Sequence, residues 1–344
     1  MTEKTFKITG MRRIERAIKA GLKSFSGFKS PPGMWAIVNK ELGDHFNSIR
    51  FFIMSILIFL AGLSAVYVAA LTIRESVASA PELDFVFLWL FNTSGKGLPP
   101  FTTFVGFLAP LMGIALGFDA VNGELNRGTM SSVLAQPVYR DAFINGKFFA
   151  GLITISLMLL ALFTLVGGLG LILIGIPPVT EEVLRIFFYL VLSVLYVAFW
   201  LSLAVLFSIL FRQTATSALS CIGSWLFFTI FFGLLVGLLA NALVPLDANA
   251  GTLEILRHER LLNTLLRFSP TILYYEAATM LLIPYQRFLG PVLLEQIEGA
   301  IPGPLPLGQS LTLVWPHFVG LLAATLLIFA ACYIKFMRME IRSS

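Results

Sequence analysis

Six long stretches without charged residues alternate with polar segments along this chain of 344 residues. Each stretch is between 18 and 29 residues long. A membrane-spanning helix needs about 20 apolar residues, and one charge at mid-bilayer costs about 2.5 to 3.5 kcal/mol. The pattern therefore predicts an all-α integral membrane protein with six transmembrane helices. The predicted spans are residues 51–73, 101–118, 148–176, 186–211, 216–240 and 311–334.

Composition agrees with this prediction. Hydrophobic residues make up 57% of the chain and charged residues 12%, whereas soluble proteins are about one quarter charged. The first 50 residues are polar and basic, and the first apolar run is too long for the apolar core of a cleavable signal peptide. We expect one multi-pass domain in the cytoplasmic (inner) membrane.

Two amphipathic segments precede the first span. Residues 1–33 place apolar residues at steps of three and four between basic ones, which predicts a helix on the anionic inner leaflet or, alternatively, a disordered basic tail. Residues 34–50 carry Trp35, Leu42 and Phe46 on one face. This second pattern predicts an interfacial helix that braces the first span from the side.

Two further segments are predicted to be irregular. The third apolar run is longer than a span needs, so it either tilts or ends irregularly near Gly167-Gly168 and Pro177-Pro178. Residues 241–310 form a large external segment of mixed charge between the fifth and sixth spans. Within it, residues 271–283 are apolar but too short to span, so we expect them to dip into the outer leaflet or cap the bundle.

Basic residues predict the orientation. Of the 24 Lys and Arg residues, 17 lie on the side of the N-terminus when six spans are assumed. Because Lys and Arg favour the cytoplasmic side, both termini and the loop at residues 119–147 are predicted to be cytoplasmic. Residues 51–240 then hold five spans, and residues 311–344 hold the sixth span and a cytoplasmic tail.

Candidate catalytic chemistry is sparse. The three histidines are scattered, and the chain contains neither a His-Glu-x-x-His motif nor a Gly-x-x-x-x-Gly-Lys-Ser/Thr loop. We therefore expect no metal site, no ATP-binding site and no catalytic site in this chain. The charge-free spans also disfavour an ion-coupled carrier, which normally holds ionisable residues within the membrane.

The polar loop at residues 119–147 joins the second and third spans and carries a motif. It resembles the pattern of type-2 ABC transporter permeases, which also have an interfacial helix, six spans and a long fifth external segment. The matching positions are Asp119, Gly123-Glu124, Arg127-Gly128-Thr129, Leu134, Pro137-Val138, Arg140 and Gly146-Lys147.

This resemblance implies that the loop contacts a separate cytoplasmic ATP-binding subunit, which would hold ATP and Mg. The residues assigned to this coupling are Glu124, Arg127, Gly128, Thr129, Leu134, Pro137 and Arg140. Residues 122–133 could form a short helix, with Glu124 and Arg127 as polar anchors, Leu134 as an apolar contact, and Gly128 giving close approach and shaping the turn with Thr129. The alternative is an ordinary polar loop with a weak surface ion pair.

Two permease halves are needed to enclose a pathway, so a second copy or a similar chain is implied. The candidate pathway residues lie on the second and fifth spans, although such aromatic residues can equally be packed or face lipid. They are Phe104, Phe107, Trp225 and Phe228.

The sequence thus predicts the permease subunit of an ABC exporter that moves a hydrophobic or amphipathic substrate. A membrane assembly factor of the same fold, serving metalloprotein maturation, is the alternative, and a secondary carrier is the third possibility. No nucleic-acid partner is expected, because the short basic segment at the N-terminus is tied to a membrane.

Overall fold

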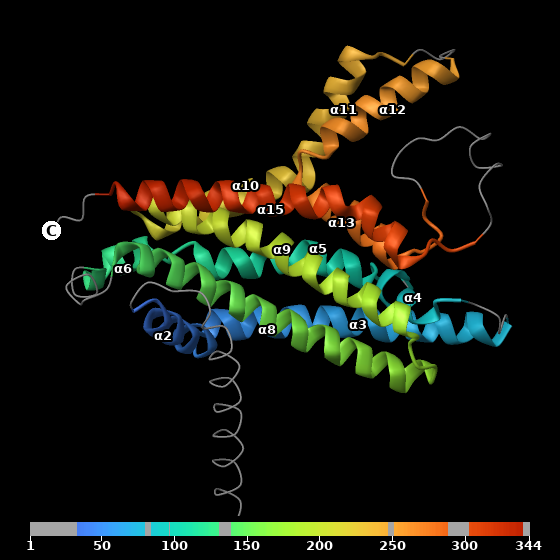
Figure 1. Cartoon of the computed structure of the whole chain (residues 1–344), viewed down its shortest axis with the longest axis horizontal. Helices are drawn as coiled ribbons and strands as arrows, with labels where there is room; N and C mark the ends of the chain where they lie inside the picture. Colours follow the sequence, from blue (N-terminus) through green and yellow to red (C-terminus); the bar gives the residue numbers. More distant parts are fainter. Residues whose placement is uncertain are drawn as a thin grey trace, which may run out of the picture.

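The computed structural model describes residues 33–79, 84–95, 97–130, 139–246, 251–287 and 303–339. These residues are helical throughout apart from turns and one isolated bridge between Gly95 and Leu98. The helices form an elongated bundle from which one hairpin projects (Figure 1). They are α2 (Met34–Phe46), α3 (Ile49–Ser79), α4 (Val86–Asn92), α5 (Phe101–Gly117), α6 (Asn122–Asn126), α8 (Arg140–Ile174), α9 (Thr180–Leu210), α10 (Thr214–Leu226), the π-helix η1 (Phe227–Phe231), α11 (Phe232–Leu243), α12 (Thr252–Leu266), α13 (Pro270–Leu282) and α15 (Leu307–Met337).

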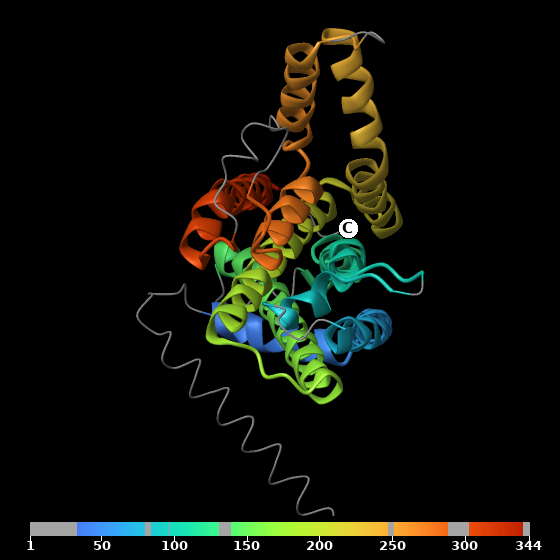
Figure 2. The ribbon, with the colours of Figure 1, turned by 90° about the vertical axis from the view of Figure 1, so that its right-hand side faces the viewer.

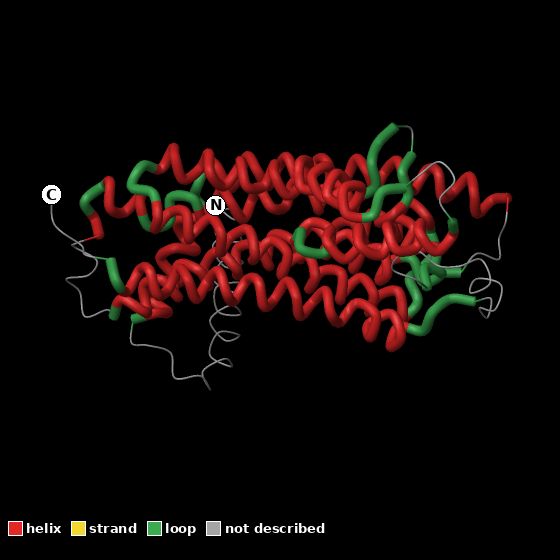
Figure 3. The backbone as a smooth tube through the Cα atoms, turned by 90° about the horizontal axis from the view of Figure 1, so that it is seen from above, coloured by secondary structure: helices red, strands yellow, loops and turns green. Residues whose placement is uncertain are grey.

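The six predicted spans are confirmed: six helices in the described part of the chain are long and apolar enough to cross a membrane. They are α3, α5 together with α6, α8, α9, the run from α10 to α11, and α15. In Figure 3 α3, α5, α8, α9 and α15 lie nearly parallel, and most of their connecting loops lie toward the two ends of the bundle. We call these the α6 end, where α2 and the end of α15 also lie, and the α4 end (Figure 1).

The third span shows how its excess length is accommodated. α8 is one continuous helix of 35 residues that passes Gly167 and Gly168 without a break. It ends at Gly175, whose φ of 77° is left-handed and suits a residue without a Cβ atom. The irregular end is therefore real, but it falls at Gly175 rather than at the glycine pair.

α9 lies at the centre of the bundle and packs on α5, α8, α13 and α15. Its largest side chains, including Trp200, are fully buried. α5 approaches α9 closely because a Cβ atom on Gly113 would lie 2.8 Å from the Val197 carbonyl oxygen, and one on Gly117 would lie 2.7 Å from the Ala204 Cβ. This close packing fixes where α5 ends, and hence where α6 begins.

The fifth span leaves the bundle. Its middle turn, η1, is a π-helix, and beyond it α11 turns away and pairs with α12 to form the projecting hairpin (Figures 1 and 2). In the most apolar 18-residue stretch of this span, 11% of the residues are buried, compared with 61% in the corresponding stretch of α9. The bend falls at the π-turn, which interrupts the regular hydrogen-bond ladder of the helix.

Residues 271–283, expected to dip into the outer leaflet or to cap the bundle, form most of α13. This helix packs against α9 and α15. Its buried face includes Tyr274, Ala277 and Leu281. Pro270 starts the helix, a position where the missing N–H is not needed.

A helix forms where the interfacial helix is predicted, but its contacts differ from the expectation. α2 buries Met34, Ile37 and Val38 and packs mainly on α8, the third span, instead of bracing the first. Trp35 and Leu42 are half-buried, and Phe46 is exposed. Phe46 does contact the first span through Phe51, with the two ring centroids 5.3 Å apart. Residues 1–32 lie outside the described part of the chain.

Candidate coupling site at the α6 end

The five-residue helix α6 is fastened to the end of α9. The backbone N–H groups of Val121 and Asn122 both donate to the Ser208 hydroxyl, at 2.9 and 3.1 Å. Two side-chain amides add to this, since Asn122 donates to the Phe211 carbonyl and Asn126 to the Arg212 carbonyl, each at 3.1 Å. These four hydrogen bonds join α6 to the last turn of α9 and the two residues after it, so we expect α6 and the end of α9 to move together.

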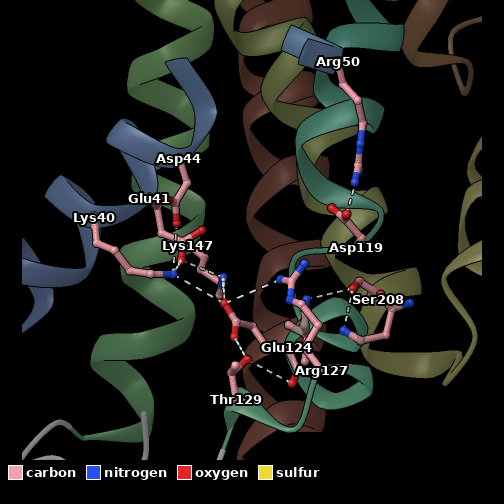
Figure 4. Close-up of polar contacts among 12 residues, drawn as sticks. Lys40, Glu41, Asp44, Arg50, Asp119, Glu124, Arg127, Thr129, Lys147 and Ser208 are labelled. Carbon is pink, nitrogen blue, oxygen red and sulfur yellow. Dashed lines mark hydrogen bonds and ion pairs between the residues drawn. The ribbon is translucent and has the colours of Figure 1, made fainter. Parts of the chain in front are cut away.

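A buried lysine joins α6 to two other helices, α2 and α8 (Figure 4). Lys147 of α8 has only 4% of its side chain exposed. Its Nζ lies 2.9 Å from Glu41 of α2 and 3.6 Å from Glu124 of α6. Because a buried charge must be compensated, this lysine links the interfacial helix, the third span and α6.

Lys40 and Thr129 complete the cluster. Lys40 lies 3.0 Å from Glu41, 3.1 Å from Asp44 and 3.5 Å from Glu124. The Thr129 hydroxyl donates to the Glu124 carboxylate and also to its backbone carbonyl. Every carboxylate in the cluster therefore has a cation or a hydroxyl group next to it.

Electrostatics favour the charged form of the buried carboxylate on α2. Burial alone would raise the pKa of Glu41, but the nearby charges of Lys147 and Lys40 outweigh this effect and lower it below its usual value. Burial lowers the pKa of His45, which favours a neutral imidazole. These groups line a cavity of about 550 Å³ between α2, α5, α6 and α8.

A second ion pair lines the same cavity. Arg50, at the start of α3, lies 2.7 Å from Asp119, which follows α5. The pair joins the first two spans at the level where α6 begins.

The predicted coupling residues divide into two groups. Glu124 faces inward, with 7% of its side chain exposed, whereas Arg127 faces outward with 62% exposed, 3.9 Å from Glu124. Gly128 has a φ of 69°, and no atom lies within 4 Å of where its Cβ would be. Gly128 therefore serves the backbone turn, and its expected close approach to a docked partner stays a prediction.

The remaining predicted positions lie further along the chain. Arg140 begins α8, and its Nη1 donates to the Met339 carbonyl at 3.1 Å, which ties the third span to the end of the sixth. Leu134 and Pro137 lie outside the described residues.

Sequence reasoning missed Lys40 and Glu41, and it placed Lys147 in the motif without assigning it a role. Two signals could have found them. Glu41 follows Met34, Ile37 and Val38 at helical spacing, so it shares their buried face. Lys147 directly precedes the apolar run of the third span, where a lysine needs a carboxylate partner.

Comparison with known proteins decides the family. The family model described as "ABC-2 family transporter protein" matches residues 35–341. The chain belongs to the ABC-2 transporter family.

Two curated relatives carry the same description, "Probable ABC transporter permease protein NosY". The protein from Pseudomonas aeruginosa is 28% identical over 249 residues, which cover 71% of this chain and 80% of the relative. The protein from Stutzerimonas stutzeri is 25% identical over 209 residues, covering 59% and 69%. This ABC-2 protein is accordingly a multi-pass membrane permease subunit of an ABC transporter, and its family implies an ATP-binding partner subunit.

The candidate pathway residues of this ABC-2 permease are partly brought together. Phe107 of α5 and Trp225 of α10 meet with ring centroids 4.7 Å apart. Trp225 is buried, whereas 41% of Phe107 is exposed. Phe104 and Phe228 are half-buried, and Phe228 packs against Trp200 at 6.3 Å. Within one copy, the second and fifth spans therefore touch at this aromatic pair.

Proposed function

We propose that this chain is the transmembrane permease of an ABC exporter, and that a separate cytoplasmic ATPase subunit docks on α6 and the turn that follows it. The observation that carries the proposal is the firm attachment of α6 to α9 beside an exposed turn at Arg127 and Gly128. An exposed turn on a fixed support suits contact with a partner that moves. The distribution of Lys and Arg supports placing the α6 end in the cytoplasm.

The contacts suggest how motion of the ATPase would reach the membrane. A push on α6 passes to α9 through Ser208 and to α5 through the chain itself. The buried Lys147 passes it to α8 and α2. In this proposal Glu124 is a positioning residue inside the permease, and Arg127 is the polar contact with the partner.

A second permease copy would complete the pathway. The fifth span has few contacts within its own bundle, and its exposed side could face the partner copy. We propose that α5 and α10 line the pathway near Phe104, Phe107, Trp225 and Phe228, and that the substrate is hydrophobic or amphipathic because these walls are apolar. ATP and Mg would bind only to the partner subunit.

The test is co-purification from the native membrane. We expect an ATPase subunit to accompany the tagged wild-type chain and to be lost with Arg127→Glu, since this change reverses an exposed charge at the docking turn. The matched control is Arg257→Glu, the same change at an exposed residue of α12. If no ATPase subunit accompanies the wild type, the exporter proposal fails; if both variants retain it equally, the docking turn is misplaced.

Metalloprotein maturation by a permease of the same fold stays a prediction. The descriptions of the two relatives state a permease without naming a substrate. Identifying the proteins that accompany the complex in the same co-purification would separate the two functions.

A further inference from the structure

A groove lies between α9 and α15 at the α6 end of the bundle. Its volume is about 590 Å³. Its apolar part is formed by one face of each helix, and its polar part by Lys335 in the last turn of α15 and Arg338 directly after that helix. The lining residues are Leu206, Ile209, Leu210, Ala331, Ile334, Lys335, Arg338 and Met339.

The charges of the groove are one-sided. Lys335 and Arg338 are exposed and lie three residues apart, so they share a face of the helix. No carboxylate lines the groove within the described residues. Two neighbouring cations repel each other, and an anion between them would relieve that repulsion.

The cavity beside Glu41 offers a contrast. Four basic residues line it, but so do four carboxylates, and they pair with one another. That cavity therefore has no net attraction for an anion. The groove between α9 and α15 combines an apolar wall with an unbalanced positive charge at its outer end.

We propose that this groove binds an anionic phospholipid. The headgroup phosphate binds Lys335 and Arg338, and an acyl chain lies along Leu206, Leu210 and Ile334. Basic pockets between membrane helices on the cytoplasmic side bind anionic headgroups by this combination of charge and apolar contact. If the α6 end faces the cytoplasm, as proposed above, the lipid comes from the inner leaflet; the binding itself does not depend on this orientation.

The bound lipid would also act on the neighbouring elements. Met339 follows Arg338, and its carbonyl accepts the hydrogen bond from Arg140 at the start of α8. A lipid that holds the end of α15 would therefore steady the start of α8. This goes beyond the docking proposal, and the binding test below needs no ATPase subunit.

The experiment uses the full-length chain, purified in detergent with any subunits that accompany it. Its thermal unfolding midpoint is followed during titration with dioleoyl phosphatidylglycerol, dioleoyl phosphatidylcholine or inorganic phosphate. We expect stabilisation by phosphatidylglycerol alone. The double variant Lys335→Gln/Arg338→Gln should weaken its binding about 25-fold, because one basic residue near an anionic surface contributes about fivefold.

Two further variants make the test specific. Arg257→Gln/Arg260→Gln removes the same charge from exposed positions of α12 and should leave phosphatidylglycerol binding unchanged. Ala331→Trp keeps both cations but fills the apolar wall, and it should weaken binding.

Four results would overturn the proposal. If the α12 control weakened phosphatidylglycerol binding as much as the groove variant does, the lipid would be attracted by the overall positive charge of the protein and not by this groove. If phosphatidylcholine stabilised the protein as much as phosphatidylglycerol does, the headgroup charge would play no role. If inorganic phosphate did so, the groove would bind an anion without an acyl chain. Unchanged binding in Ala331→Trp would show that no acyl chain occupies the groove.

Discussion

At the scale of single residues, the buried Lys147 is the most consequential side chain of the candidate site. It compensates two carboxylates that lie more than 80 residues apart along the chain, Glu41 and Glu124. Its contact with Glu41 is the shorter of the two, and the more exposed Lys40 forms a second ion pair with Glu41. Removing the lysine leaves buried negative charge with only Lys40 and Arg127 near it.

We expect Lys147→Met to destabilise the protein by about 3 kcal/mol, because breaking a buried pair strands the remaining charge. Adding Glu41→Gln should recover part of this loss, with a coupling energy of at least about 1 kcal/mol. Equilibrium unfolding in detergent measures both values. Arg212→Met, which removes an exposed cation, should stay within about 0.5 kcal/mol of wild type. Strictly additive effects would contradict the assigned pair.

Glu41 also predicts a dependence of stability on pH. Its pKa in the folded protein lies below the ordinary value of 4.5. A lowered pKa stabilises the fold fully above pH 4.5, and this contribution is lost as the pH falls through the folded-state pKa. The thermal midpoint of wild type should therefore fall more steeply below pH 4.5 than that of Glu41→Gln. Parallel curves for the two proteins would show that Glu41 does not carry this effect.

At the scale of elements, α6 and its turn combine a rigid and an exposed part. The helix is held through Ser208 and its own asparagines, whereas the turn at Gly128 meets no side chain within 4 Å of its Cβ position. The left-handed φ of Gly128 is the feature that shapes the surface offered to a partner.

Gly128→Ala places a Cβ in a left-handed conformation, which costs about 1 to 2 kcal/mol. Since the docked turn must keep its shape, we expect the affinity for the ATPase subunit to fall by about fivefold or more. Gly123→Ala is the matched control, because this helical glycine has room for a Cβ atom, with the nearest atoms at 3.5 Å. A pull-down titration compares the two variants. Equal affinities would show that the turn changes shape on docking.

At the scale of the whole molecule, a buried arginine secures the α4 end as Lys147 secures the α6 end. Arg185 of α9 is fully buried and pairs with Glu181 at 2.8 Å. It also donates to the carbonyls of Leu281, at the end of α13, and Leu305, just before α15. One guanidinium group therefore joins three segments. α9 begins at Thr180, before the predicted fourth span, so the helix carries Arg185 although residues 186–211 of the predicted span are free of charge.

Arg185→Met should cost about 3 kcal/mol, because it leaves two buried carbonyl groups without their donor. Arg185→Lys should recover only part of this, since an ammonium group lacks the guanidinium fork. Glu181→Gln should cost less than about 1 kcal/mol, because Glu181 is partly exposed. Thermal unfolding in detergent gives the order of the three variants. A larger loss with Glu181→Gln than with Arg185→Met would contradict this account.

The sequence by itself determined the six spans, the interfacial helix and the position of the polar loop, because the bilayer demands apolar length locally and penalises charge. It could not decide which apolar face packs inside, since lipid and protein interior are equally apolar to a helix. The burial of α13, the bend at η1 and the inward turn of Glu124 therefore required the tertiary structure. So did the pairing of Lys147 with Glu41 and the groove between α9 and α15, because these contacts join residues that are distant in the sequence.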